Sequence, residues 1–161
     1  LLDHHTPGGD VVHMTIGEPK HTFPAWVTDV IAENAAGFNN YPPNEGCEEL
    51  RGAMSDWIAR RYGVKMDADR QVMALNGTRE GLYNAAMALC PETKNGARPA
   101  VLIPNPFYQV YMVATISVGA EPVFVPATAA TGHLPDYENL PEDVLNRTAV
   151  AYICSPDNPQ G

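Results

Sequence analysis

The apolar positions along the chain follow two patterns, and the change from one pattern to the other predicts the order of elements. Apolar side chains recur at helical spacing from Pro24 to a stop at Gly37, and again from Glu45 to a stop at Gly63. Further along, they come in short uninterrupted runs, each followed by a turn and a helical stripe. The sequence therefore predicts two helices, followed by a series of strand and helix units.

The short apolar runs predict a parallel sheet. Strands are expected at 72–75, 100–103, 122–125 and 149–154, with helices at 82–89, 108–117 and 141–146, and a further apolar segment lies at 11–16. Apolar strands that alternate with helices are typical of a parallel sheet covered by helices on both faces. The predicted fold class is α/β.

Composition narrows the classes of partner. The chain has 10 Lys and Arg residues against 19 Asp and Glu residues, a net charge of −9, which argues against nucleic acid and membrane partners. No apolar run is long enough to span a membrane, and the first residues lack a signal-peptide pattern. The three cysteines form no CxxC pair and the histidines lack metal-ligand spacing, so no metal site is indicated. We expect a soluble, cytoplasmic protein.

The loops that follow the strands are the candidate sites, because ligands of a parallel sheet bind beyond the carboxyl ends of its strands. The first is 76–80, where Gly77 lets the backbone approach a ligand. The free N–H groups of the following helix start and the Thr78 hydroxyl suit a phosphate. The same residues could equally form a turn with Thr78 as the helix N-cap.

Two further loops carry candidate groups. In 104–111, prolines stiffen the chain and an aromatic ring could stack on a flat cofactor. Alternatively, Phe107, Tyr108 and Tyr111 are core aromatics, and we expect this of at least one of them. In 155–161, Asn158 offers an amide donor to a ring oxygen, although the segment could also be a simple turn.

Taken in order, these motifs resemble the fold-type I, pyridoxal-phosphate-dependent aminotransferases of classes I and II. The matching pieces are Ile16-Gly17-Glu18-Pro19, Tyr41-Pro42-Pro43-Asn44-Glu45-Gly46 with Glu49-Leu50-Arg51, Asn76-Gly77-Thr78-Arg79-Glu80, Pro106-Phe107-Tyr108 and Asn158-Pro159-Gln160-Gly161. Within this family, segments 17–21, 76–80, 104–109 and 154–156 are similar to the succinyldiaminopimelate aminotransferases of lysine biosynthesis.

The resemblance implies a role for each residue that matches a cofactor-binding motif. Backbone amides at Gly77, Thr78 and Arg79 would hold the phosphate of pyridoxal 5'-phosphate. Tyr108 would stack on the pyridine ring, and Asn158 would donate a hydrogen bond to its phenolic oxygen. These implied roles agree with the chemistry of the three loops.

The resemblance also implies partners and a domain division. Tyr41 would reach the phosphate of the neighbouring subunit in a homodimer, and Gly17 would lie beside the substrate carboxylate. Residues 1–45 would be a leading segment of the small domain and interdomain region, and 46–161 the first half of the large cofactor-binding domain. The Schiff-base lysine would lie beyond Gly161, so this chain is an N-terminal fragment that needs the remainder of the protein and is expected to be inactive alone.

The activity implied is transfer of an amino group between an amino acid, expected to be glutamate, and a keto acid. N-succinyl-2-amino-6-ketopimelate of lysine biosynthesis is the candidate keto acid. Two alternatives remain open, because the matched residues bind cofactor and do not select the reaction. One is another fold-type I enzyme such as a carbon–sulfur lyase, and the other is a non-enzymatic, aminotransferase-like sensor domain.

Overall fold

The computed structural model describes residues 8–10, 17–19 and 21–160. The chain divides into two compact units, residues 1–43 and residues 44–161. This division falls close to the boundary proposed between residues 45 and 46. The apolar segment predicted at 11–16 lies outside the described residues.

The described residues of the first unit form one α-helix and a short 3-10 helix. The α-helix α1 runs over Trp26–Glu33, and the 3-10 helix η1 over Ala35–Asn39. The α-helix ends because Asn34 leaves helical geometry, and its side-chain amide donates to the Val30 carbonyl at 2.9 Å. The single helix predicted from 24 to 37 is therefore two helical pieces.

The second unit begins with helix α2, Glu48–Tyr62, which ends at Gly63 in the left-handed conformation (φ 70°). Arg51 fastens this helix to the chain on either side of it. Its guanidinium donates to the Gly46 carbonyl, to the Ala68 carbonyl at 3.1 Å and to the Asp69 carboxylate at 2.8 Å. The Arg51 of the YPPNEG…ELR motif is therefore a structural clamp.

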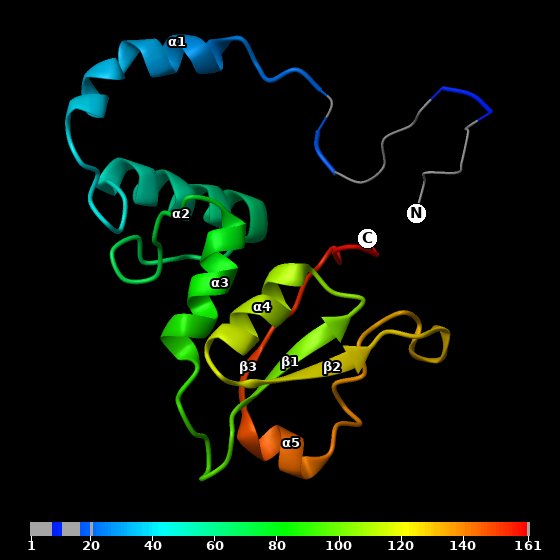
Figure 1. Cartoon of the computed structure of the whole chain (residues 1–161). Helices are drawn as coiled ribbons and strands as arrows, with labels where there is room; N and C mark the ends of the chain where they lie inside the picture. The colour runs from blue at the N-terminus through cyan, green and yellow to red at the C-terminus, as the bar shows by residue number, and fades with distance from the viewer. Residues whose placement is uncertain (1–7, 11–16, 20, 161) are drawn as a thin grey trace. The chain divides into compact units, whose positions relative to one another are not determined.

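Among the described residues, three parallel strands form a sheet in the order β2-β1-β3 (Figure 1). They are β1 (Ala100–Asn105), β2 (Glu121–Pro126) and β3 (Thr148–Ala151). Strand β1 lies between the other two, and its first five residues are buried. These strands match three of the predicted apolar runs.

The remaining helices connect and cover the strands. Helix α3 spans Thr78–Leu89, α4 spans Gln109–Ser117, α5 spans Glu142–Arg147, and a 3-10 turn, η2, spans Ala129–Thr131. Helices α3 and α4 pack against each other, α4 contacts β1 and β2, and α3 contacts β3. An ion pair between Arg147 and Glu121 (2.6 Å) joins the end of α5 to the start of β2, and it lowers the pKa of the Glu121 carboxyl.

The strand predicted at 72–75 is wrong. Within the described part of the chain this segment joins no sheet, and its backbone hydrogen bond is from the Ala74 N–H to the Glu45 carbonyl (2.9 Å). Met73 and Leu75 are more than half exposed. Apolar composition suits a strand, but a strand also needs a neighbouring strand to pair with, and none of the described strands pairs with 72–75. The strand predicted at 149–154 is shorter than expected and ends at Ala151.

The core lies between the sheet and helices α3 and α4. Val101 and Ile103 of β1 are fully buried against Val110, Tyr111 and Tyr152. No helix in the described ranges is long and apolar enough to cross a membrane.

Gly46 and Gly52 provide a matched test of the α2 anchor. Gly46 has φ 91°, and a Cβ there would lie 2.7 Å from the Ala74 Cβ, whereas a Cβ on Gly52, inside α2, meets nothing within 4 Å. We expect Gly46→Ala to lower the free energy of unfolding by about 1–3 kcal/mol, and Gly52→Ala to raise it by about 0.4–1 kcal/mol. Urea titration of both variants checks this, and equal effects would contradict the role of Gly46.

Candidate functional site

The start of helix α3 is built to receive an anion. Gly77 is the N-cap, with φ 108° and ψ 152°, a conformation that glycine adopts without strain. No side chain of the described residues caps the helix, so its first N–H groups remain available. A Cβ at Gly77 would meet nothing within 4 Å, so the space beside this glycine is open. Thr78 is the first helical residue, so the alternative of a Thr78 N-cap is wrong.

Two of the candidate loops meet at this helix start. A cavity of about 420 Å³ lies between the start of α3 and the start of α4. Its lining residues come from both elements and are Asn76, Arg79, Glu80, Tyr83, Gln109, Val110 and Val113. The cavity therefore brings Arg79 and Glu80, in the first turn of α3, beside Gln109, the residue that follows Tyr108.

Tyr108 stands at the N-cap of α4 and is half-buried. Its ring meets the ring of Tyr111 edge-on, with centroids 5.8 Å apart and an interplanar angle of 89°. Tyr111 is 3% exposed, and Phe107 lies against Phe124 with centroids 5.1 Å apart. The prediction that at least one of these aromatics belongs to the core is confirmed by Tyr111.

The third loop lies at the carboxyl edge of the sheet. A cavity of about 800 Å³ is lined there by Pro104 at the end of β1, by residues 132–135 and 137, and by residues 153–157 and 160. Asn158 is exposed in the turn between the lining residues Asp157 and Gln160, and it lines neither this cavity nor the one at α3. Asn158 therefore shares no cavity with the residues at the start of α3.

Tyrosines near this edge are held in the neutral form. Burial of the ring raises the pKa of Tyr111 to about 12, and the neighbouring Cys154 thiol and Asp157 carboxylate act in the same direction. Burial of the ring also raises the pKa of the Tyr137 phenol, and the negative charge of the Asp157 carboxylate adds to this shift. Both phenols therefore stay protonated to a higher pH than an ordinary tyrosine.

Tyr137 and Tyr152 were missed by the sequence reasoning. The Tyr137 hydroxyl donates to the Tyr152 carbonyl at 3.0 Å, and the Tyr152 hydroxyl donates to the Leu82 carbonyl in α3 at 2.9 Å. Tyr152 and Leu82 are 70 residues apart. No short motif marks such a contact. The only signal that Tyr152 lies in the core was its place in the apolar run predicted as a strand at 149–154.

Two predicted site residues belong to the first unit. Tyr41 is fully exposed, and Gly17 is exposed with nothing within 4 Å of a Cβ placed on it. Their roles toward a partner subunit and a substrate carboxylate stay predictions. Among the described residues, no group of three or more His, Cys, Asp or Glu side chains could hold a metal ion.

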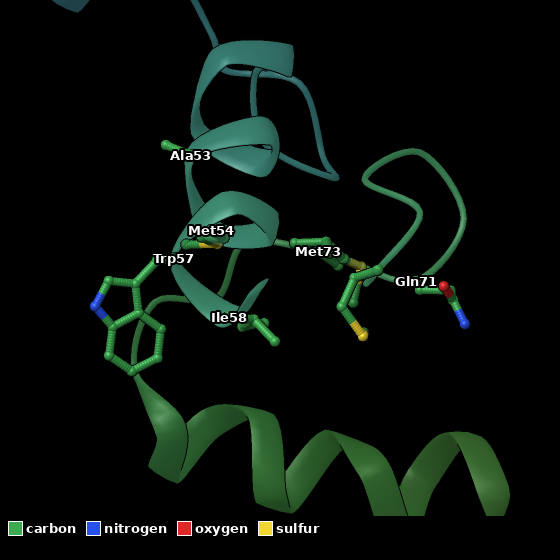
Figure 2. A pocket seen from close by; sticks show the side chains of 8 residues that line it. Ala53, Met54, Trp57, Ile58, Gln71 and Met73 are labelled. Atoms are coloured by element: carbon green, nitrogen blue, oxygen red, sulfur yellow. The ribbon is translucent and has the colours of Figure 1, made fainter. Parts of the chain in front are cut away.

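A separate pocket of about 530 Å³ lies beside α2 (Figure 2). It is mostly apolar, and its lining residues are Ala53, Met54, Trp57, Ile58, Met66, Gln71, Val72 and Met73. Figure 2 shows Trp57 and Ile58 extending from α2 on the side where the next helix passes. None of the predicted site residues lines this pocket.

Comparison with known proteins identifies what the chain is similar to. The sequence model of the family described as aminotransferase class I and II matches residues 9–161. An LL-diaminopimelate aminotransferase from Moorella thermoacetica is 38% identical over 156 residues, which are 96% of this chain and 39% of that protein. The chain therefore spans less than half the length of the curated relatives it matches.

Solved structures with a similar fold are also aminotransferases. An aminotransferase from Neisseria meningitidis superimposes with a TM-score of 0.85 at 37% identity, covering 94% of this chain and 38% of that chain. The N-succinyldiaminopimelate aminotransferase from Mycobacterium tuberculosis gives a TM-score of 0.71 at 30% identity, covering 89% of this chain and 37% of that one. The α/β class and the family resemblance predicted from the motifs are confirmed.

Gly77→Ala tests the anion cradle. The alanine would strain the backbone by about 1–3 kcal/mol, and rotation that relieves the strain would turn the N–H groups away from the ligand. We expect roughly tenfold weaker binding of pyridoxal 5'-phosphate by the whole protein, measured by absorbance titration. Gly119→Ala is the control, because Gly119 also has a positive φ (74°) and open space but lies after α4. A similar loss of affinity in both variants would contradict the cradle.

Proposed function

The chain belongs to the class I and II aminotransferases, and from this premise we propose that the whole protein transfers an amino group between an amino acid and a keto acid. The family depends on pyridoxal 5'-phosphate. The observation that carries the proposal is the uncapped start of α3 at Gly77, next to a cavity whose lining includes Asn76 and Arg79 on either side of it. When bound, the cofactor supplies an aldehyde and an electron sink for exchanging an amino group.

The described residues fit this cofactor. The N–H groups of Thr78 and Arg79 would bind its phosphate, helped by the positive end of the α3 dipole. A phosphate demands donors and positive charge, and the Arg79 side chain adds both at the cavity wall. This half of the site needs no side-chain rearrangement, because the donors are backbone groups fixed by the helix.

The aromatic and amide groups would orient the flat part of the cofactor. Tyr108 would offer a ring face for stacking, and Asn158 would donate its amide N–H to the phenolic oxygen. Tyr108 is held at the start of α4, next to two residues that line the cavity. Asn158 lies in a separate loop, so we propose that the cofactor itself bridges the two regions.

The groups that move protons would come from elsewhere in the whole protein. Of the lysines that the structure describes, Lys65 lies in the loop after α2 and Lys94 in a turn before β1, and neither lines one of the three cavities described above. We place the lysine that binds the cofactor covalently outside residues 1–161, and Tyr41 at the phosphate of a second subunit in a homodimer.

The substrate is proposed to be of the diaminopimelate type, with glutamate and 2-oxoglutarate as the other amino and keto acid pair. The names of the relatives support this class, because they include LL-diaminopimelate and N-succinyldiaminopimelate aminotransferases. The curated relatives carry the unsuccinylated name, which favours LL-diaminopimelate itself over its N-succinyl derivative.

A substrate comparison with the whole, cofactor-loaded protein tests this function. We expect 2-oxoglutarate to be converted to glutamate when LL-diaminopimelate is present, and more slowly with the N-succinyl derivative, because the relatives act on the free amino acid by name. Liquid chromatography with mass detection measures both products. Cystathionine is the control for carbon–sulfur cleavage, and release of a thiol with no glutamate formed would contradict an aminotransferase.

A further inference from the structure

Three tyrosine rings form a continuous cluster that includes Tyr108 of the candidate site. In this tyrosine cluster, defined as Tyr108, Tyr111 and Tyr152, the middle ring contacts both others. Tyr111 stacks on Tyr152 with centroids 4.4 Å apart and planes 17° from parallel, and it meets Tyr108 edge-on at 5.8 Å. Such offset-stacked and edge-to-face pairs are favourable beyond the area they bury.

The cluster reaches all three candidate loops. Tyr108 is itself the predicted stacking residue. The Tyr152 hydroxyl donates to the Leu82 carbonyl, one turn after Thr78 in α3, and so joins the cluster to the cradle helix. Tyr111 lies close enough to Cys154 and Asp157 to be influenced by both, and these residues precede Asn158 in the third loop.

Tyr111 is itself held firmly. It is 3% exposed and packs in the core with Val101 and Ile103. The Thr115 hydroxyl donates to its carbonyl at 2.7 Å within α4. A ring fixed in this way can transmit its position to its neighbours, whereas an unbranched apolar side chain would fill the volume without fixing a plane.

We propose that Tyr111 is a positioning residue that sets the placement of Tyr108, the start of α3 and the loop of Asn158 relative to one another. This inference rests on the proposed function, because the cofactor of that function is the ligand that the three segments would share. Tyr111 does not contact that ligand and acts through the ring of Tyr108 and through Tyr152. The alternative is that Tyr111 only fills the core.

Two substitutions separate these roles. Tyr111→Leu removes both ring contacts, and Tyr111→Phe keeps them and removes the hydroxyl beside Cys154. Val125→Ala is the control for general destabilisation, because Val125 is 1% exposed in β2 and lies outside the tyrosine cluster. The whole protein is used throughout, and melting temperature is measured for each variant.

Binding of pyridoxal 5'-phosphate is the first readout. We expect Tyr111→Leu to raise the dissociation constant about threefold to tenfold, the loss of one aromatic pair at the site, and to shift the cofactor absorbance band. Tyr111→Phe is expected to stay within about twofold of the unsubstituted protein. Val125→Ala should lower the melting temperature without changing the affinity or the band.

Hydrogen exchange in cofactor-free protein is the second readout. We expect Tyr111→Leu to speed amide exchange in 76–80, 107–109 and 154–158 together. Val125→Ala should leave the ratios of the exchange rates of these three segments unchanged. If Tyr111→Leu lowers stability but alters neither affinity nor exchange in the three segments, the positioning role is overturned. If the unsubstituted protein does not bind the cofactor, the proposed function fails, and the exchange pattern still decides the role of Tyr111.

Discussion

Parallel pairing of β1 with strands on both of its sides is the constraint on which the rest of the second unit depends. Because β2 and β3 run in the same direction as β1, their carboxyl ends fall at one edge of the sheet. The loops that follow β1 and β3 carry Tyr108 and Asn158, so the pairing alone brings their loops to one edge. Burial of β1 on both faces holds this edge in place, since its first five residues are inaccessible to water.

The sequence predicted the elements whose cause is local or strongly periodic. The apolar runs at 100–103 and 122–125 lie within β1 and β2, and Gly63 ends α2 as its position indicated. The run at 72–75 has the same composition but forms no strand, because pairing depends on a neighbour that composition does not reveal. Helix α1 ends at a local signal, Asn34, whose backbone leaves helical geometry and whose side-chain amide also donates to the Val30 carbonyl.

The candidate site also combines local features, which the sequence predicts, with long-range contacts, which it does not. Gly77 was predictable because a positive φ before a helix is a local demand that glycine meets. The contact of Tyr152 with Leu82 was not, because it joins residues that are distant in sequence and belongs to no motif. The sequence offered three aromatic candidates in one loop, Phe107, Tyr108 and Tyr111. Only their packing shows that Tyr111 is buried and that Tyr108 stands at the start of α4.

This division explains why the chain indicates a cofactor more sharply than a substrate. Backbone N–H groups and an aromatic face recognise a phosphate and a flat ring, and both belong to the cofactor whichever amino acid is bound. Selecting among amino acids requires side chains that face the substrate's own distal groups, and the motifs of this chain lie instead at the helix start and the strand ends. Substitutions in the cradle and the tyrosine cluster should therefore change cofactor binding for every substrate to the same degree, whereas a change of substrate preference must arise from other positions.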